Sequence, residues 1–390
     1  MTIAFLVVAW MTVAIIGLVS LSAFERSGRS RPRLDRPELA PPRAVWGGGP
    51  LHPPSRAATA RALAGFARLV RRRTRVVDHR RGLRRLSRLL GCGSLVLGLA
   101  LLPIAGTWGG ADGPPLLLLD LDGGLIALLL VLLAMAFARI AIGLSERSAW
   151  SRMGAARQAS RAIAGTALLV LASMPLAIDA GSLRLHDLVV DQQRTLWPVA
   201  GMAKLFGPDV VATLEAWPVP AWHLFTQPLT AVLFAAAITL WISSPRVDVP
   251  GAGLVGVAGY GLDGDATEHY WIRVESRLAA VFAAGLFVSL FLGAGSLPLF
   301  DPALLVDQAE PFLGRGVPEA MVTLVHVGVF AGKLVFVLFL GTRVARLSAA
   351  SRDDRSLRLA TRRLLPVAWA NLLLVAAIAL WLEGLPGVGA

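Results

Sequence analysis

Two ionisable side chains inside a long apolar segment are the residues of this sequence best placed to do chemistry. Lys333 lies about midway along the apolar residues 318–342, and His326 lies seven residues earlier on the same helical face. Because a charge at that depth in a membrane is costly, the position predicts a functional role. The alternative is a structural lysine, buried and paired with a carboxylate on a neighbouring helix.

The remaining reactive side chains point to no catalytic centre on this chain. Arg139 lies near the end of the apolar residues 116–144, where its long side chain is expected to reach the membrane surface. A single cysteine, Cys92, excludes a cysteine-ligated iron–sulfur cluster, and the six histidines lack metal-ligand spacing. We therefore expect neither metal nor flavin on this chain, and any redox centre to belong to a partner.

The composition predicts an all-α, polytopic membrane protein that forms one domain over residues 1–390. The chain is 55% hydrophobic and 16% charged, whereas soluble proteins carry about 25% charged residues. Its apolar residues form long runs, and within lipid such runs satisfy their backbone as helices. We expect about eight transmembrane helices, at residues 3–23, 89–107, 116–144, 162–179, 227–244, 277–297, 318–342 and 364–382.

The net charge of +13 comes almost entirely from residues 25–88, which hold 18 arginines against four acids. A basic stretch beside a hydrophobic helix is typical of a cytoplasmic loop that faces anionic lipid, so nucleic acid is not the expected partner. Part of the loop is amphipathic and predicts one helix lying in the membrane interface. Its apolar face carries Leu63, Phe66 and Val70, and its opposite face Arg61, Arg68 and Arg72.

The distribution of arginine among the loops predicts the orientation. Loops 25–88, 145–161 and 343–363 are rich in arginine, which places them in the cytoplasm and both termini outside a bacterial inner membrane. Loop 245–275 is cytoplasmic by the same count but acidic, which indicates either a docking surface or a merely solvated loop. Its acids are Asp248, Asp263, Asp265, Glu268 and Glu275.

A series of short motifs runs along most of the chain. In chain order they include Asp122-Gly123-Gly124-Leu125, Gln227-Pro228-Leu229, Asp248-Val249-Pro250, Ala258-Gly259-Tyr260, Phe291-Leu292-Gly293 and Asn371-Leu372-Leu373. In order and spacing the series resembles the H subunit of NADH–quinone oxidoreductase (respiratory complex I), a family shared with the membrane subunits of group 4 hydrogenases.

The resemblance implies a subunit that links a peripheral redox arm to a membrane arm in a proton-translocating enzyme. It implies a quinone bound at the interface with partner subunits, which are iron–sulfur peripheral subunits and membrane-arm subunits, with lipid around them. Candidate residues of the quinone chamber are Glu25, Arg26, Pro41, Arg43, Asp248, Pro250 and Glu275. Candidate interface residues are Arg157, Arg352, Asp354 and Arg358.

The sequence departs from the family where the family carries membrane acids. The family's Tyr-Glu corresponds to Gly165-Thr166, and its Glu-Thr-Asn-Arg to Trp241-Ile242-Ser243-Ser244. Neutral side chains at these positions cannot exchange protons with a quinone or a water chain. The alternative function is therefore a structural membrane anchor of a redox complex, or of a hydrogenase-type complex, without quinone binding or proton coupling.

Overall fold

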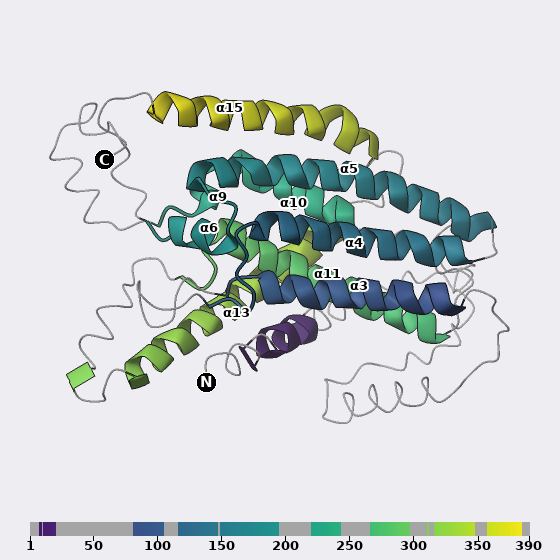
Figure 1. Ribbon diagram of the computed structural model, residues 1–390, viewed down its shortest axis with the longest axis horizontal. Coiled ribbons are helices and arrows are strands. Elements are labelled where there is room, and N and C mark those ends of the chain that lie inside the picture. The colour runs from purple at the N-terminus through teal and green to yellow at the C-terminus, as the bar shows by residue number, and fades with distance from the viewer. Residues whose placement is uncertain are drawn as a thin grey trace, which may run out of the picture.

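The computed structural model describes ten stretches of the chain, and the regular elements in them are helices (Figure 1). The stretches are residues 8–9, 11–20, 81–104, 116–146, 149–194, 220–242, 266–296, 310–311, 316–347 and 357–383. The helices are Met11–Ser20, α3 (Arg81–Leu101), α4 (Gly124–Ser145), α5 (Ala149–Ala180), α6 (Leu185–Asp191), α9 (His223–Thr226), α10 (Pro228–Ile242), α11 (Ala266–Phe291), α13 (Gly316–Leu347), the π-helix η2 (Ala360–Leu364) and α15 (Leu365–Glu383).

The all-α membrane fold expected from the composition is confirmed. Five described segments are long and apolar enough to cross a membrane, and two shorter apolar helices accompany them. Each of the eight expected spans overlaps one of the described helices. The five long segments are Gly124–Ser145, Ser151–Ala180, Val274–Phe291, Gly316–Val344 and Leu357–Trp381, and the shorter ones are Met11–Ser20 and Pro228–Trp241.

Several expected boundaries are wrong, because a helix does not end where its apolar residues end. α5 begins at Ala149, so most of the expected loop 145–161 is helical. α11 begins at Ala266, so the end of the expected acidic loop 245–275 is helical too. A helix closes its own backbone hydrogen bonds and can continue past the bilayer into water. The expected start at residue 116 is also wrong: the Leu119 N–H donates to the Ala100 carbonyl, and α4 begins only at Gly124.

The expected interfacial helix, with Leu63, Phe66 and Val70, lies outside the described residues. The same holds for most of the acidic loop, including Asp248 and Asp263. Both remain predictions.

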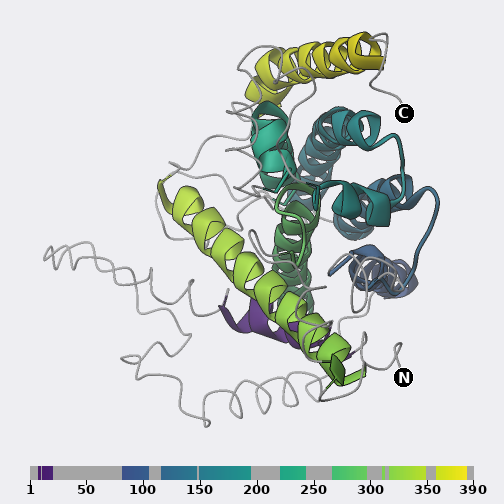
Figure 2. The same ribbon diagram turned by 90° about the vertical axis from the view of Figure 1, so that its left-hand side faces the viewer.

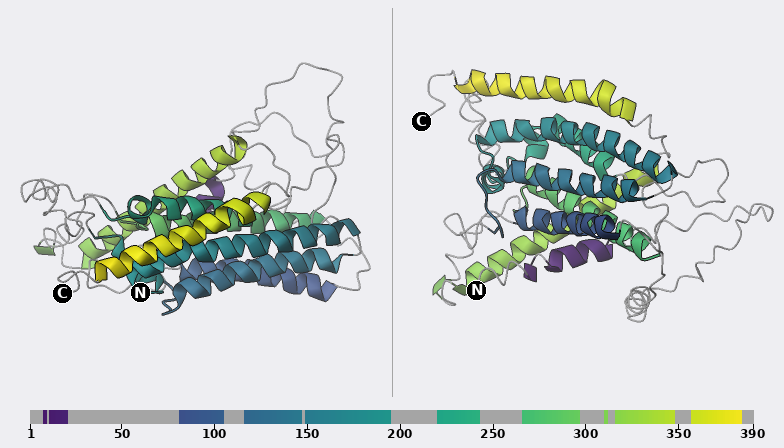
Figure 3. Two further views of the ribbon diagram at one scale, coloured as in Figure 1. Left: turned by 90° about the horizontal axis from the view of Figure 1, so that it is seen from above. Right: turned by 45° about the vertical axis from the view of Figure 1, so that its right-hand side comes forward.

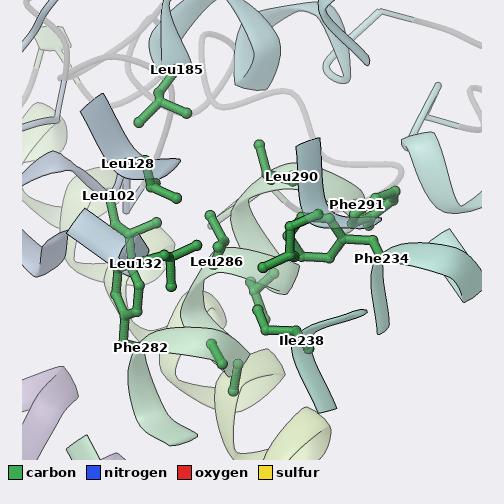
Figure 4. Packing of buried hydrophobic residues seen from close by; sticks show 14 of the residues in the cluster. Leu102, Leu128, Leu132, Leu185, Phe234, Ile238, Phe282, Leu286, Leu290 and Phe291 are labelled. Carbon is green, nitrogen blue, oxygen red and sulfur yellow. The ribbon is translucent and has the colours of Figure 1, made fainter. Parts of the chain in front are cut away.

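The helices pack as a bundle whose long axes are mostly aligned (Figures 1 and 3). α4 lies between α3 and α5, and α10 and α15 pack on α5. α11 contacts α3, α10 and α13, and α13 crosses it obliquely (Figure 2). Figure 4 shows the apolar core around α11, where the Phe234 and Phe291 rings lie 5.2 Å apart. α15 is the most peripheral of the five long segments, with 11% of its span buried.

α11 ends in a sharp bend in which Gly293 and Ala294 both have a positive φ. Gly293 has a φ of +64°, in the left-handed region where a side chain is strained. Gly295 lies so close to α13 that a β-carbon there would sit 2.4 Å from the His326 carbonyl oxygen and 2.9 Å from that of Ile104. Both obstacles are backbone atoms, so no side-chain rotation relieves them.

Replacing Gly295 with alanine should therefore separate α13 from α11. We expect a loss of stability of about 1–3 kcal/mol or more, from overpacking against rigid backbone. Gly328→Ala is the matched control, because nothing lies within 4 Å of a β-carbon at that helical position. Thermal unfolding in detergent measures both, and equal melting temperatures for the two variants would contradict the close approach.

Candidate functional site

A buried ion pair between α4 and α11 is the centre of the candidate site. The Arg139 Nε donates to Glu275 Oε1 at 2.9 Å, and the two side chains are 1% and 5% exposed. The Arg139 Nη1 lies 3.4 Å from the Trp241 carbonyl oxygen, and its guanidinium lies 5.5 Å from the Trp241 ring centroid. Three helices therefore share one buried charge pair.

Basic side chains lie near this ion pair, and the cavity beside it is small. Gly91 of α3 faces Glu275, and a β-carbon at Gly91 would lie 3.4 Å from the carboxylate carbon, at an ordinary contact distance. The Arg84 Nε donates to Ser145 Oγ at 3.2 Å, which joins the ends of α3 and α4. The cavity beside the pair has a volume of about 10 Å³, which is the space of about one water molecule. It is lined by Arg84, Arg88, Cys92, Ile142, Trp271, Ile272 and Glu275.

The ion pair corrects two expectations. Arg139 does not reach the membrane surface; the interpretation was wrong because it weighed the length of the side chain without a buried partner for its charge. Glu275 does not lie on a loop: it is 4% exposed and sits inside α11. The partner could have been found from sequence only by pairing this arginine with an acid far along the chain.

Lys333 binds the backbone where α11 ends. Its Nζ donates to the carbonyl oxygens of Leu292, Ala294 and Ser296, at 2.6, 3.0 and 2.6 Å. An ammonium group has three N–H donors, so these bonds use all of them. The Nζ also lies 4.2 Å from the Trp222 ring centroid, a cation–π contact. The sequence left open that Lys333 is a structural lysine paired with a carboxylate on a neighbouring helix. Among the contacts described for Lys333, the partners are instead carbonyls and an aromatic ring.

His326 is 7% exposed, and its Nδ1 has no hydrogen-bond partner among the described residues. Its backbone carbonyl packs against Gly295, so His326 and Lys333 both belong to the contact between α13 and the end of α11.

A polar network ties the helices together at the end of the bundle where α6 and α9 lie. The Gln227 Nε2 donates to Asp179 Oδ2 at 2.9 Å, and Gln227 Oε1 accepts from Thr230 Oγ1 at 3.1 Å. Asn371 Nδ2 donates to Thr230 Oγ1 at 2.9 Å. The chain of bonds joins α5, α10 and α15, and it gives a physical reason for two motif residues, Gln227 and Asn371.

Asp122, from the first motif, lies at the same end. The Arg184 guanidinium bridges the carboxylates of Asp120 and Asp122, which join the start of α4 to the start of α6. The hydrogen bond that Arg184 donates to Asp120, reinforced by the charge of that carboxylate, raises the pKa of Arg184 above its ordinary value. Arg184 therefore stays charged throughout the physiological range.

The structure brings together only some of the predicted site residues. Arg157 and Arg358 are both exposed, and Leu357 and Ala360 beside Arg358 pack with Ala164 of α5, so the two arginines lie toward the same end of the bundle. The other candidates lie outside the described residues and remain predictions. They are Glu25, Arg26, Pro41, Arg43, Asp248, Pro250, Arg352 and Asp354.

Comparisons with known proteins agree with the motif series. Residues 50–376 match the NADH dehydrogenase family. The NADH-quinone oxidoreductase H subunit of Maricaulis maris is 25% identical over 275 residues, which cover 70% of each chain. The protein of the same description from Thermomicrobium roseum is 25% identical over 71% of this chain and 68% of its own length. NADH-quinone oxidoreductase subunit 8 of Rhodothermus marinus is 24% identical over 66% of this chain and 67% of its own.

Removing one partner of the buried ion pair should be costly. We expect Arg139→Ala to destabilise the protein by about 3–5 kcal/mol, because it leaves the Glu275 carboxylate buried and uncompensated. Arg152→Ala, at an exposed position of α5, should have little effect. The double variant Arg139→Met with Glu275→Gln should recover most of the loss. Unfolding in detergent measures all three, and a double variant as unstable as Arg139→Ala would contradict the charge-pair explanation.

Loss of the Lys333 ammonium should also weaken the fold. Lys333→Met removes the donor to three carbonyls, and each buried group left unsatisfied costs about 1–3 kcal/mol. Leu324→Met, at an exposed apolar position of the same helix, is the control. Hydrogen exchange of the amides at residues 292–296 should rise in Lys333→Met alone. Unchanged exchange there would show that the ammonium does not hold this segment.

Proposed function

Since this chain belongs to the NADH dehydrogenase family and is a divergent member of its H-subunit group, we propose that it links the peripheral and membrane arms of such a complex and frames its quinone site. The chain is a multi-pass membrane protein and part of an oxidoreductase complex. Quinone would bind where the described bundle meets partner subunits that carry the iron–sulfur clusters. The basic end of the bundle would face the bacterial cytoplasm, with both termini outside.

The Arg139–Glu275 pair is the observation that supports this proposal best. It fixes α4 and α11 beside a small cavity with arginines around it. A cavity of about 10 Å³ is too small for a quinone headgroup, so the described helices would form one wall. The other walls would come from the first cytoplasmic loop, which carries Arg43, and from partner subunits.

A second function has its own support, which is the packing at two positions where the resemblance places a tyrosine and a glutamate. Trp241 is 2% exposed, and a β-carbon at Gly165 would lie 3.5 Å from the Trp241 Cβ, so these two departures from the family pattern pack against each other. A site rebuilt in neutral, close-packed side chains suits a membrane anchor that neither binds quinone nor couples protons.

The experiment is to purify the tagged chain with its partners from native membranes in mild detergent and to assay quinone reduction. We expect inhibitor-sensitive activity, and we expect Glu275→Gln and Arg43→Ala each to lower it roughly ten- to hundredfold by misplacing the quinone. His186→Ala, a change at the opposite end of the bundle, is the control for handling and expression.

Partner content is measured for every variant. Complete assemblies without quinone activity in the unmodified protein would favour the anchor. Full activity in both Glu275→Gln and Arg43→Ala would reject these residues as part of the quinone site. Absence of redox partners would overturn both functions.

A further inference from the structure

α6 and α9 lie beside the end of α5 at one end of the bundle (Figure 1). Three side chains that could hold a metal ion meet there, one from each of these elements. Asp179 comes from the last turn of α5, Asp191 is the last residue of α6, and His223 is the first residue of α9. One ligand atom from each lies within 4.8 Å of the others. The three are far apart in sequence, so residue spacing could not have indicated the cluster.

The orientation of His223 carries the argument. The ring is 1% exposed, and its Nδ1 lies 2.7 Å from the Leu290 carbonyl oxygen. A carbonyl only accepts, so Nδ1 carries the proton, and in the neutral ring Nε2 presents a lone pair. That Nε2 has no hydrogen-bond partner among the described residues, although it points at the two carboxylates. A buried imidazole with one nitrogen fixed and the other free is arranged as a metal ligand.

The distance to Asp191 fits a shared cation better than a direct bond. His223 Nε2 lies 3.7 Å from Asp191 Oδ2, which is beyond hydrogen-bond range. Two ligands that each lie about 2.1 Å from one tetrahedral ion are roughly 3.4 Å apart. A small inward movement of exposed Asp179 and of Asp191 would complete three of the four positions, and water would take the fourth.

Neighbouring groups orient the two carboxylates. Gln227 donates to Asp179 Oδ2 at 2.9 Å, and the Arg194 guanidinium lies 2.6 Å from Asp191 Oδ1. Each carboxylate therefore keeps one oxygen for a cation. Arg194 offsets part of the negative charge, but its side chain is 73% exposed, so water screens that effect.

We propose that Asp179, Asp191 and His223 bind one divalent cation, and that Zn²⁺ suits this mixed imidazole and carboxylate set best. The ion joins the ends of α5, α6 and α9. Through the bond from His223 to Leu290, it also supports the end of α11. The rival is a metal-free ion pair between protonated His223 and Asp191.

The test uses the full chain, purified in detergent with a tag that contains no histidine and stripped with EDTA. On titration with Zn²⁺ we expect one ion bound per chain and a higher melting temperature, because a ligand that binds only the folded state stabilises it. Asp191→Asn and Asp179→Asn should each weaken Zn²⁺ binding by roughly tenfold or more and lose the thermal gain. Mg²⁺ at the same concentration should give no gain.

His186→Ala is the matched control, since it removes a histidine of α6 that lies outside the cluster, and it should bind Zn²⁺ like the unmodified chain. The proposal is overturned if the double variant Asp179→Asn with Asp191→Asn binds as much Zn²⁺ as the unmodified chain. It is also overturned if Asp191→Asn lowers the melting temperature while Zn²⁺ has no effect on the unmodified protein, which is the behaviour of a metal-free ion pair.

Discussion

The carbonyl oxygens at the end of α11 are bound, one after another, by donors from other parts of the bundle. Gln192, in the segment after α6, donates to the Ser289 carbonyl oxygen, and His223 of α9 donates to that of Leu290. Lys333 of α13 donates to the carbonyl oxygens of Leu292, Ala294 and Ser296. A helix that ends inside a bundle has no water to satisfy these groups, and each one left unpaired is costly. The positions of α9, α13 and the segment after α6 against the end of α11 all serve this requirement.

α11 is thus held by polar contacts near both ends and by apolar packing between them. Toward its start, Glu275 is bound to Arg139. At its end, His223 binds the Leu290 carbonyl, and Lys333 binds carbonyls of the segment that follows directly. Between these points Phe282, Leu286 and Phe291 fill the core (Figure 4). Because each polar anchor comes from a different helix, a movement of α11 would have to break ion pairs and hydrogen bonds in low dielectric surroundings, where they are strong.

The sequence predicted the parts of this arrangement that depend on composition. Runs of apolar residues identify the spans, because lipid requires about twenty of them in a row. The sequence could not predict what depends on pairs of distant residues. Arg139 was expected to reach the surface because it lies near the end of an apolar segment, and its partner, Glu275, is 136 residues away. The sequence did not indicate the cluster of Asp179, Asp191 and His223 for the same reason. Lys333 was recognised because its burial alone is unusual.

The departures from the family pattern are structurally linked, which bears on what the missing acids mean. Gly165 and Trp241 stand where the resemblance places polar residues, and here they pack against each other. The Trp241 ring lies beside Arg139. The acidic partner of Arg139 among the described contacts is Glu275. The pair and the Trp241 contacts join α4, α10 and α11, which is a structural role that both the quinone-site proposal and the membrane-anchor alternative require.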